Sequence, residues 1–297
     1  MNSVLVIGSS GQVGNALVKR LTADPDLDVR AFDRSSLDIT DRTVMDLVIR
    51  RSNPEIVVNA AAFTNVEKAE GDEHLAYSVN SEAPKNIARI CKQLTIPLIH
   101  ISSEYVFDGE KGSPYSESDE PNPLNVYGKT KLEGEEGIRS SLNQHIIVRT
   151  SWVFSETGNN FVKTMLALGA EARSLAVVSD QIGGPTSASG VAAAIHTIVT
   201  RYFKNRGLDW GTYNFCGVPE VSWFEFAQAI FQLARDANLL NIIPDLEKIS
   251  AADYTCKALR PRNSLLNCDK IFDCYGIRPD DWVASLRDVM HKIHAAS

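Results

Sequence analysis

The chain has 297 residues, of which 44% are hydrophobic and 23% charged, a composition typical of a globular protein with a large core. The formal net charge is −7 at pH 7, and an acidic surface argues against a general affinity for nucleic acid or anionic membranes. The five cysteines are odd in number and lack C-x-x-C spacing, which argues against a disulfide framework or a zinc site. With no signal peptide or membrane-spanning run in the sequence, we expect a soluble, cytoplasmic protein.

Short apolar runs alternate with helical patterns through the first half of the chain. The expected strands are Val4–Ile7, Asp28–Phe32, Ile56–Val58, Pro97–Ile101 and Ile146–Arg149. The expected helices are one that follows the first strand and those over Asp41–Arg51, Asn80–Leu94 and Tyr127–Ile138. In the second helix, Val44, Leu47 and Val48 are expected to form the apolar face. The alternation predicts crossover units and a parallel sheet covered on both faces.

The regular alternation weakens after about residue 150. Helices are expected over Val191–Phe203, Ser222–Ala237 and Trp282–Ile293, with Gly183-Gly184-Pro185 as a turn and an irregular stretch over Pro244–Pro261. The predicted fold is α/β: residues 1–150 form a Rossmann-type domain with a doubly wound parallel sheet. Residues 151–297 form mainly a smaller substrate-binding lobe, and the chain is free to cross between the lobes.

Two kinds of residue are interpreted as structural. The six histidines, His100 among them, have no metal-ligand spacing with cysteines or carboxylates, so they are assigned to the surface or the core. Trp210, Trp223 and Trp282 are assigned to packing within the core or the lobe.

Three glycines follow the first strand in the segment Gly8-Ser9-Ser10-Gly11-Gln12-Val13-Gly14. Gly8 permits a tight turn, Gly11 lets a pyrophosphate approach the backbone, and Gly14 lets the helix pack against the strand. The N–H groups at the start of the helix are then available to phosphate oxygens. In this strand–turn–helix context the pattern predicts dinucleotide binding, although a purely structural turn is the alternative.

Two charged residues at the end of the second strand bear on the choice of cofactor. Asp33 can accept hydrogen bonds from an adenosine ribose, which favours NAD. Arg34 can pair with a 2′-phosphate, which favours NADP. Just beyond them, Asp38 can meet the adenine amino group and Ile39 can pack on the ring. The choice between the cofactors stays open.

Tyr127 and Lys131 form the most specific catalytic pattern. They are four residues apart and share one face of the predicted helix. Reduction of a ketone needs an acid that protonates the new alkoxide, and a free tyrosine has a pKa of about 10. We expect the Lys131 ammonium to lower that pKa and to hold the nicotinamide ribose. Ser103 follows the strand that ends at Ile101, where its hydroxyl can bond the substrate carbonyl.

Serine, tyrosine and lysine in this order, after a glycine-rich turn, are the parts of a short-chain dehydrogenase/reductase. Longer segments resemble the dTDP-4-dehydrorhamnose reductase family, and the resemblance runs from the N-terminus to about residue 275. The segments that carry it are residues 58–64 (VNAAAFT), 102–109 (SSEYVFDG), 123–135 (PLNVYGKTKLEGE), 149–154 (RTSWVF), 158–161 (GNNF) and 180–186 (DQIGGPT).

This resemblance implies reduction of dTDP-4-dehydro-L-rhamnose to dTDP-L-rhamnose with NADPH or NADH. By position, Tyr127 is the proton donor, Lys131 its partner and Ser103 the hydroxyl that orients the carbonyl. Residues and resemblance together predict a cofactor site of Gly8, Ser10, Gly11, Gln12, Val13, Gly14, Asp33, Arg34, Asp38, Ile39, Ala60, Ala62, Phe63, Thr64, Tyr127 and Lys131. The predicted substrate residues are Ser103, Glu104, Tyr105, Trp152, Asn160 and Arg260. Some members are associated with a magnesium-bridged homodimer, but no residue of this chain is predicted as a metal ligand.

Two positions depart from the family pattern. The family usually has Thr-Asp where this chain has Ser103-Glu104, and often Arg where this chain has Leu265, so the sugar and the base are less firmly predicted than the reaction. A nucleotide-sugar epimerase or dehydratase with tightly held NAD is one alternative, although only one of the two carboxylates that a dehydratase needs follows Ser103. A non-catalytic regulatory subunit of the same fold is the other, and the intact catalytic set argues against it.

Overall fold

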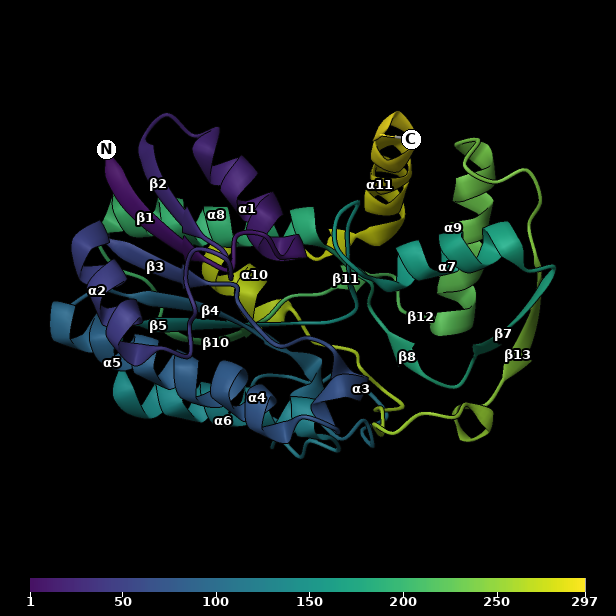
Figure 1. The fold of residues 1–297 in the computed structure, drawn as a ribbon, viewed down its shortest axis with the longest axis horizontal. Helices are drawn as coiled ribbons and strands as arrows, with labels where there is room; N and C mark the ends of the chain where they lie inside the picture. Colours follow the sequence, from purple (N-terminus) through teal and green to yellow (C-terminus); the bar gives the residue numbers. More distant parts are fainter. Residues whose placement is uncertain (297) are drawn as a thin grey trace.

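A six-stranded parallel sheet forms the centre of the computed structural model, which describes residues 1–296 (Figure 1). The strand order is β10-β5-β4-β3-β1-β2, and every pair in it is parallel. Its members are β1 (Asn2–Ile7), β2 (Leu27–Phe32), β3 (Ile56–Asn59), β4 (Leu98–Ser103), β5 (His145–Thr150) and β10 (Gly211–Asn214). The five strands expected from the first half are present, and the predicted doubly wound sheet is confirmed.

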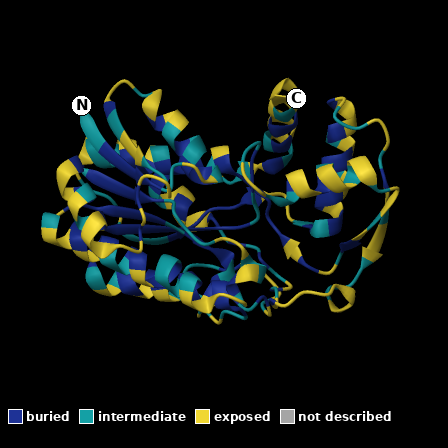
Figure 2. Cartoon of the chain, viewed as in Figure 1, coloured by how far each residue is buried: buried dark blue, intermediate teal, exposed yellow. Residues whose placement is uncertain are grey.

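Both faces of the sheet are buried under helices (Figure 2). In β1, Val4 and Val6 belong to the core under α1 (Gln12–Thr22) and α8 (Ala188–Asn205). Leu5 and Ile7 belong to the core under α2 (Arg42–Ser52) and α5 (Ala83–Leu94). Alternate residues of one strand therefore feed two cores, which is why the strands of this sheet are continuous apolar runs. The helix α6 (Val126–Ser141) packs beside α5.

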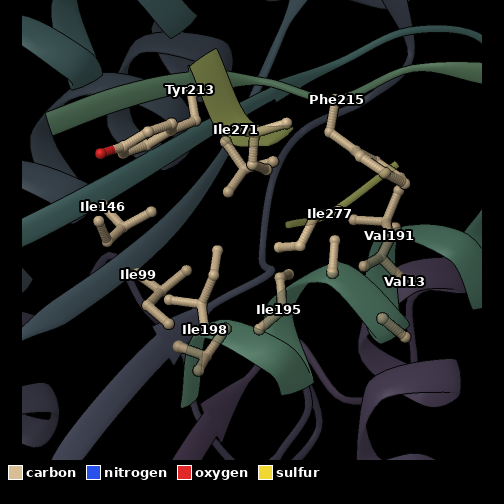
Figure 3. Close-up of a cluster of buried hydrophobic side chains, with 14 of the residues drawn as sticks. Val13, Ile99, Ile146, Val191, Ile195, Ile198, Tyr213, Phe215, Ile271 and Ile277 are labelled. Atoms are coloured by element: carbon tan, nitrogen blue, oxygen red, sulfur yellow. The ribbon is translucent and has the colours of Figure 1, made fainter. Parts of the chain in front are cut away.

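The sixth strand and one covering helix come from beyond residue 150. Tyr213 of β10 and Ile195 and Ile198 of α8 join Ile99 and Ile146 in one buried cluster (Figure 3). The chain thus returns to the sheet after it has entered the smaller lobe. The sequence did not predict β10, because four residues that begin with glycine give neither an apolar run nor an alternating pattern.

The smaller lobe has its own core, built from α7 (Phe161–Glu171), α9 (Trp223–Asp236) and α11 (Trp282–Ala296). Beside it, β7 (Ser174–Val178) pairs with β13 (Asp245–Ile249). The expectation of an irregular stretch over Pro244–Pro261 was therefore wrong for its first part. Asp245, Glu247 and Lys248 are charged and mostly exposed, so this ribbon has no apolar face that a sequence pattern could show.

The remaining elements are short. Three two-residue pairs join β6 (Val153–Phe154) to β9 (Thr186–Ser187), β8 (Ile182–Gly183) to β12 (Val221–Ser222), and β11 (Gly217–Val218) to β14 (Asp280–Asp281). The short helical segments are α3 (Val66–Ala69), α4 (Glu73–Tyr77), the π-helical η1 (Ser78–Glu82), the 3-10 helices η2 (Glu104–Val106) and η3 (Ala251–Asp253), and α10 (Asp269–Tyr275). All five cysteines have free thiols. Among the described helices, none has both the length and the apolar character needed to cross a lipid bilayer.

The buried face of α2 differs from the predicted one. Val44 and Leu47 are 39% and 45% exposed, whereas Met45 and Ile49 are fully buried. Val48 packs at the edge of the core. Apolar residues occupy five of the six positions from 44 to 49, so spacing alone cannot select the face, and packing against α5 decides it.

Met45→Ala and Leu47→Ala are a matched test of this face. We expect the first to lower the free energy of unfolding by about 2–5 kcal/mol, because it leaves a cavity in the core. The second should change it by no more than about 0.5 kcal/mol, because the side chain is at the surface. Denaturant titration of both variants measures the difference. Equal losses of stability would mean that Leu47 is as buried as Met45, in contradiction to the structure.

Candidate active site

The candidate site lies where the order of the sheet reverses. β1 has β2 on one side and β3 on the other, so the connections that follow β1 and β3 diverge at the carboxyl end of the sheet. A cavity of about 660 Å³ occupies this position. The predicted site residues that line it are Gly8, Ser10, Gly11, Gln12, Val13, Asp33, Arg34, Asp38, Ile39, Ala60, Ala62, Phe63, Thr64, Ser103, Glu104, Tyr105, Tyr127, Lys131 and Trp152.

The three glycines of the turn meet different constraints. Gly8 has φ +87°, and a Cβ there would collide with the backbone of Ala61. A Cβ on Gly14 would collide with the carbonyl oxygen of Gly8. Gly11 has φ −67°, and a Cβ on it would meet only that same oxygen, at 3.4 Å. The fold therefore requires Gly8 and Gly14, whereas at Gly11 the protein itself leaves room for a side chain.

The helix α1 begins directly after the turn with its first N–H groups uncapped by any side chain and with no acidic residue in its first turn. Such an end attracts phosphate. Beside it, Oε1 of Gln12 accepts hydrogen bonds from Ser155 Oγ and Asn160 Nδ2, both at 2.9 Å. These bonds join the turn to the smaller lobe. Asn160 lies outside the residues that line the cavity, so its predicted contact with substrate stays a prediction.

The charged residues after β2 are held by their own turn. Oδ1 of Asp33 accepts hydrogen bonds from the backbone and hydroxyl groups of Ser35 and Ser36, and these lower the pKa of Asp33. Asp38 Oδ1 accepts from the backbone and hydroxyl of Thr40, which lowers the pKa of Asp38, and the charge of Arg34 lowers it further. Both carboxylates and the guanidinium therefore face the cavity as charged groups.

Tyr127 enters the cavity from the first turn of α6. Asn125 caps this helix by accepting a hydrogen bond from the N–H of Gly128 at 2.8 Å. The Tyr127 ring is buried and makes an edge-on contact with the Tyr105 ring, at 5.5 Å between centroids. Burial raises the pKa of Tyr127, the Glu104 carboxyl raises it further, and a hydrogen bond with Ser103 opposes both. The phenol is thus held in its protonated form.

Lys131 is buried one turn beyond Tyr127, but it does not act on the phenol in the predicted way. Its Nζ donates to the carbonyl oxygen of Ile101 at 2.7 Å and lies 3.3 Å from Nε2 of His100. Burial lowers the pKa of Lys131 to about 8, opposed by the charge of Glu135. The expectation that the pKa of Tyr127 is lowered is therefore wrong for this structure, because burial and the charge of Glu104 raise it.

Glu104 is a second buried ionisable group in the cavity. Ser103 Oγ donates to Glu104 Oε2 at 2.6 Å. Burial raises the pKa of Glu104 to about 7, although hydrogen bonds from Ser103 and from backbone N–H groups, that of Trp152 included, favour the carboxylate. Ser103, Glu104 and Tyr127 are thus one hydrogen-bonded set in which the carboxyl titrates near neutral pH.

Trp152 has an unusual backbone for a residue of its size, with φ +46°. Its indole stacks on that of Trp223, with 3.4 Å between ring centroids and 8° between planes. Both indoles line the cavity. The sequence assigned Trp223 to packing and missed it as a site residue, because it lies 71 positions away along the chain and no local pattern marks it.

Besides Asn160, two predicted residues lie outside the cavity. Arg260 pairs with Glu67, with 3.3 Å between Nη2 and Oε1, and does not line the cavity. Its predicted contact with substrate stays a prediction. Gly14 is packed beneath the turn. Within residues 1–296, no group of three or more histidine, cysteine or acidic side chains could hold a metal ion.

Comparisons with known proteins agree with one another. The family model described as the RmlD substrate binding domain matches residues 1–295. The dTDP-4-dehydrorhamnose reductase of Aggregatibacter actinomycetemcomitans is 41% identical over 97% of this chain and 98% of its own. The crystal structure of a dTDP-4-dehydrorhamnose reductase from Clostridium acetobutylicum has a TM-score of 0.89 and 33% identity, over 98% of this chain and 99% of that one. That of a dTDP-4-dehydrorhamnose reductase from Bacillus anthracis, in complex with NADP, has a TM-score of 0.88 and 32% identity, with the same coverage.

Gly11→Ala and Gly14→Ala separate binding from folding in the glycine turn. We expect Gly11→Ala to keep the stability of the fold or raise it by up to about 1 kcal/mol, since its backbone suits alanine. Its affinity for the nicotinamide dinucleotide should fall at least tenfold, because the methyl group occupies the approach of the pyrophosphate. Gly14→Ala should cost at least about 1 kcal/mol of stability through overpacking. Thermal unfolding measures the stability of each variant, and fluorescence titration measures its affinity for the cofactor. Unchanged affinity in Gly11→Ala would indicate that the turn is purely structural.

Glu104→Gln tests the buried carboxyl through stability. An acid whose pKa is raised from 4.5 in the unfolded chain to about 7 in the fold loses stability as pH rises between these values. The variant should therefore match the wild type near pH 4.5 and exceed it by roughly 3 kcal/mol above pH 7. Urea titrations from pH 4.5 to 8 give this difference, and a gap that does not change with pH would show that Glu104 keeps an ordinary pKa.

Proposed function

We propose that this chain, which belongs to the dTDP-4-dehydrorhamnose reductase family, reduces dTDP-4-dehydro-L-rhamnose to dTDP-L-rhamnose with a reduced nicotinamide cofactor. One observation carries the proposal: Ser103, Tyr127 and Lys131 line the same cavity as the glycine turn. A hydride donor and a proton donor can therefore serve one carbonyl group. The product is an activated sugar for carbohydrate biosynthesis.

The cavity fits a dinucleotide on its own evidence. The uncapped start of α1 suits a pyrophosphate. A Cβ on Gly11 would fit the fold, so packing within the protein does not explain why a glycine stands there. Thr150 also has a buried hydroxyl without a partner among the described residues, and it lines the same cavity. When bound, the reduced nicotinamide supplies the hydride. Arg34 favours NADPH, which agrees with the NADP bound by the relative from Bacillus anthracis.

Tyr127 is the proton donor in this proposal. Its raised pKa keeps the phenol protonated at neutral pH, so it can give its proton to the oxygen at C4 of the sugar as the carbonyl becomes an alcohol. Ser103 orients that oxygen when its single hydroxyl donor, which points to Glu104 in the structure, turns to the substrate carbonyl. Lys131, as an ammonium, stabilises the phenolate that remains, and one proton from solvent then restores the phenol.

Substrate recognition is assigned to the residues around this group. Glu104, Tyr105 and Trp152 line the cavity and are the predicted contacts with the sugar. Trp223 joins them, because its indole extends the surface of Trp152. Apolar faces of this kind suit the methyl group of a 6-deoxy sugar.

The two alternative functions are not favoured. Close relatives are named as reductases, and beside Ser103 the chain has the single carboxylate Glu104 followed by Tyr105, whereas a dehydratase needs two. A regulatory subunit has no need of the complete set of Ser103, Tyr127 and Lys131. A homodimer, its bridging magnesium and a cytoplasmic location stay predictions from sequence and resemblance.

The direct test is a substrate panel. The protein is incubated with NADPH or NADH and with dTDP-, GDP- and UDP-linked 4-keto sugars, and the absorbance of the reduced nicotinamide is followed. We expect turnover with the dTDP-linked 4-keto-rhamnose and faster reaction with NADPH. Stoichiometric NAD that stays bound to the purified protein, without turnover of added NADPH, would instead indicate the epimerase.

Tyr127→Phe tests the proton donor. It removes only the hydroxyl, so turnover should fall at least a hundredfold, a loss in the range for one general acid, while the dissociation constant of the cofactor stays within about threefold. Steady-state kinetics and cofactor titration give the two numbers. Turnover that survives the substitution would remove Tyr127 from this role.

A further inference from the structure

Lys131 contacts a pair of buried polar side chains, Asn59 and His100, that do not line the cavity and that the proposed reaction does not use. Asn59 ends β3, His100 lies within β4, and Lys131 projects from α6. Their exposures are 0%, 0% and 2%. Nδ2 of Asn59 is 3.1 Å from Nδ1 of His100, and Nε2 of the same ring is 3.3 Å from Nζ of Lys131.

The backbone fixes the direction of the first bond. The N–H of Ala61 donates to Oδ1 of Asn59 at 3.1 Å, so the amide nitrogen is the atom that faces the histidine. An amide nitrogen only donates, and Nδ1 of His100 must therefore accept. Burial is the larger cause that lowers the pKa of His100 well below its usual value and keeps the ring neutral, and any positive charge on Lys131 acts in the same direction. A neutral ring that accepts at Nδ1 has its proton on Nε2.

This tautomer matters to Lys131. The Nε2–H of His100 points at Nζ, and an ammonium has three donors and no acceptor. A neutral amine can accept this N–H through its lone pair and still donate to the carbonyl oxygen of Ile101, 2.7 Å away. The bonds of all three side chains are satisfied together only when Lys131 is an amine.

We propose that His100, held by Asn59, is a positioning residue that favours the neutral amine of Lys131 and opposes its ammonium. The inference deepens the proposed function and rests on it. Each reduction consumes one proton that solvent must supply. A Lys131 ammonium that His100 disfavours gives its proton readily to the Tyr127 phenolate, and the amine that remains then takes up the next proton from solvent.

The other charged groups around Lys131 do not replace this effect. On α6, Tyr127 is held protonated, and Glu135 favours the ammonium. The carboxylate of Glu135 is shared with two guanidiniums, those of Arg149 from β5 and Arg139. Glu104, after β4, lies with Ser103 at the cavity. His100 is uncharged and contacts Nζ directly, so it acts on Lys131 through the direction of its hydrogen bond. A donor at Nε2 favours the amine of Lys131 over the ammonium.

Two variants should shift the titration of Lys131 upward. In His100→Gln, the amide can turn its oxygen toward Nζ and accept from the ammonium. In Asn59→Asp, one carboxylate oxygen accepts from Ala61 and the other from Nδ1–H of His100, which leaves Nε2 as an acceptor for Lys131. We expect the alkaline limb of the pH profile of kcat to move up by at least one pH unit in each. At pH 9 each variant then retains a roughly fivefold larger share of its own maximal rate than the wild type. A merely structural histidine would lower kcat at every pH and leave the limb in place, and that result would overturn the proposal.

A second measurement needs neither variant nor turnover. Two-bond nitrogen–proton correlation spectra of the wild type labelled with ¹⁵N-histidine report the tautomer of each neutral ring, with His100 assigned through the backbone. We expect a protonated Nε2 and an accepting Nδ1 that persist from pH 6 to 9. A protonated Nδ1 would overturn the inference even if the protein is a reductase. A protein that shows the expected tautomer but reduces no 4-keto sugar would contradict the proposed function alone.

Discussion

A buried ion pair between Glu135 of α6 and Arg149 of β5 is the interaction on which the site depends. Nε and Nη2 of the arginine donate to the two carboxylate oxygens at 2.9 and 2.6 Å, and the guanidinium lies 5.0 Å from the centre of the Phe107 ring. To turn or slide α6 would leave two charges unpaired in the core, which is far more costly than the pair itself is stabilising. The pair therefore fixes which face of α6 meets the sheet. Since Lys131 and Tyr127 lie one and two turns before Glu135, that face delivers both to the end of β4.

Local patterns predicted the parts of the site whose geometry is itself local. The glycine turn and the spacing of Tyr127 and Lys131 fix positions within one turn and one helix, and the structure brings them to one cavity. Patterns failed where distant packing decides. The face of α2 is selected by α5, β13 exists because β7 lies beside it, and Trp223 reaches the cavity by stacking on Trp152. None of these partners is adjacent in sequence.

The error about Tyr127 has the same origin. Spacing places an ammonium one turn from the phenol, and that predicts a lowered pKa if the two groups are considered alone. The structure adds two facts that spacing does not contain: both groups are buried, and Lys131 has His100 and Ile101 as partners from β4. Burial disfavours the charged form of either group, so the pKa of the tyrosine rises while that of the lysine falls.

Burial acts in the same sense on Glu104, and the result concerns the ligands as much as the protein. The pKa values of Glu104 and Lys131 are about 7 and about 8, so each group can gain or lose a proton near neutral pH. The net charge of the inner cavity can therefore change with little cost in free energy. In the proposed reaction, a nucleotide sugar and a nicotinamide dinucleotide each bring a negatively charged pyrophosphate to this cavity. A permanently ionised Glu104 would repel them at close range in a medium of low dielectric constant. A carboxyl that accepts a proton at small cost avoids that repulsion, and its hydrogen bond to Ser103 keeps it beside the reacting carbonyl.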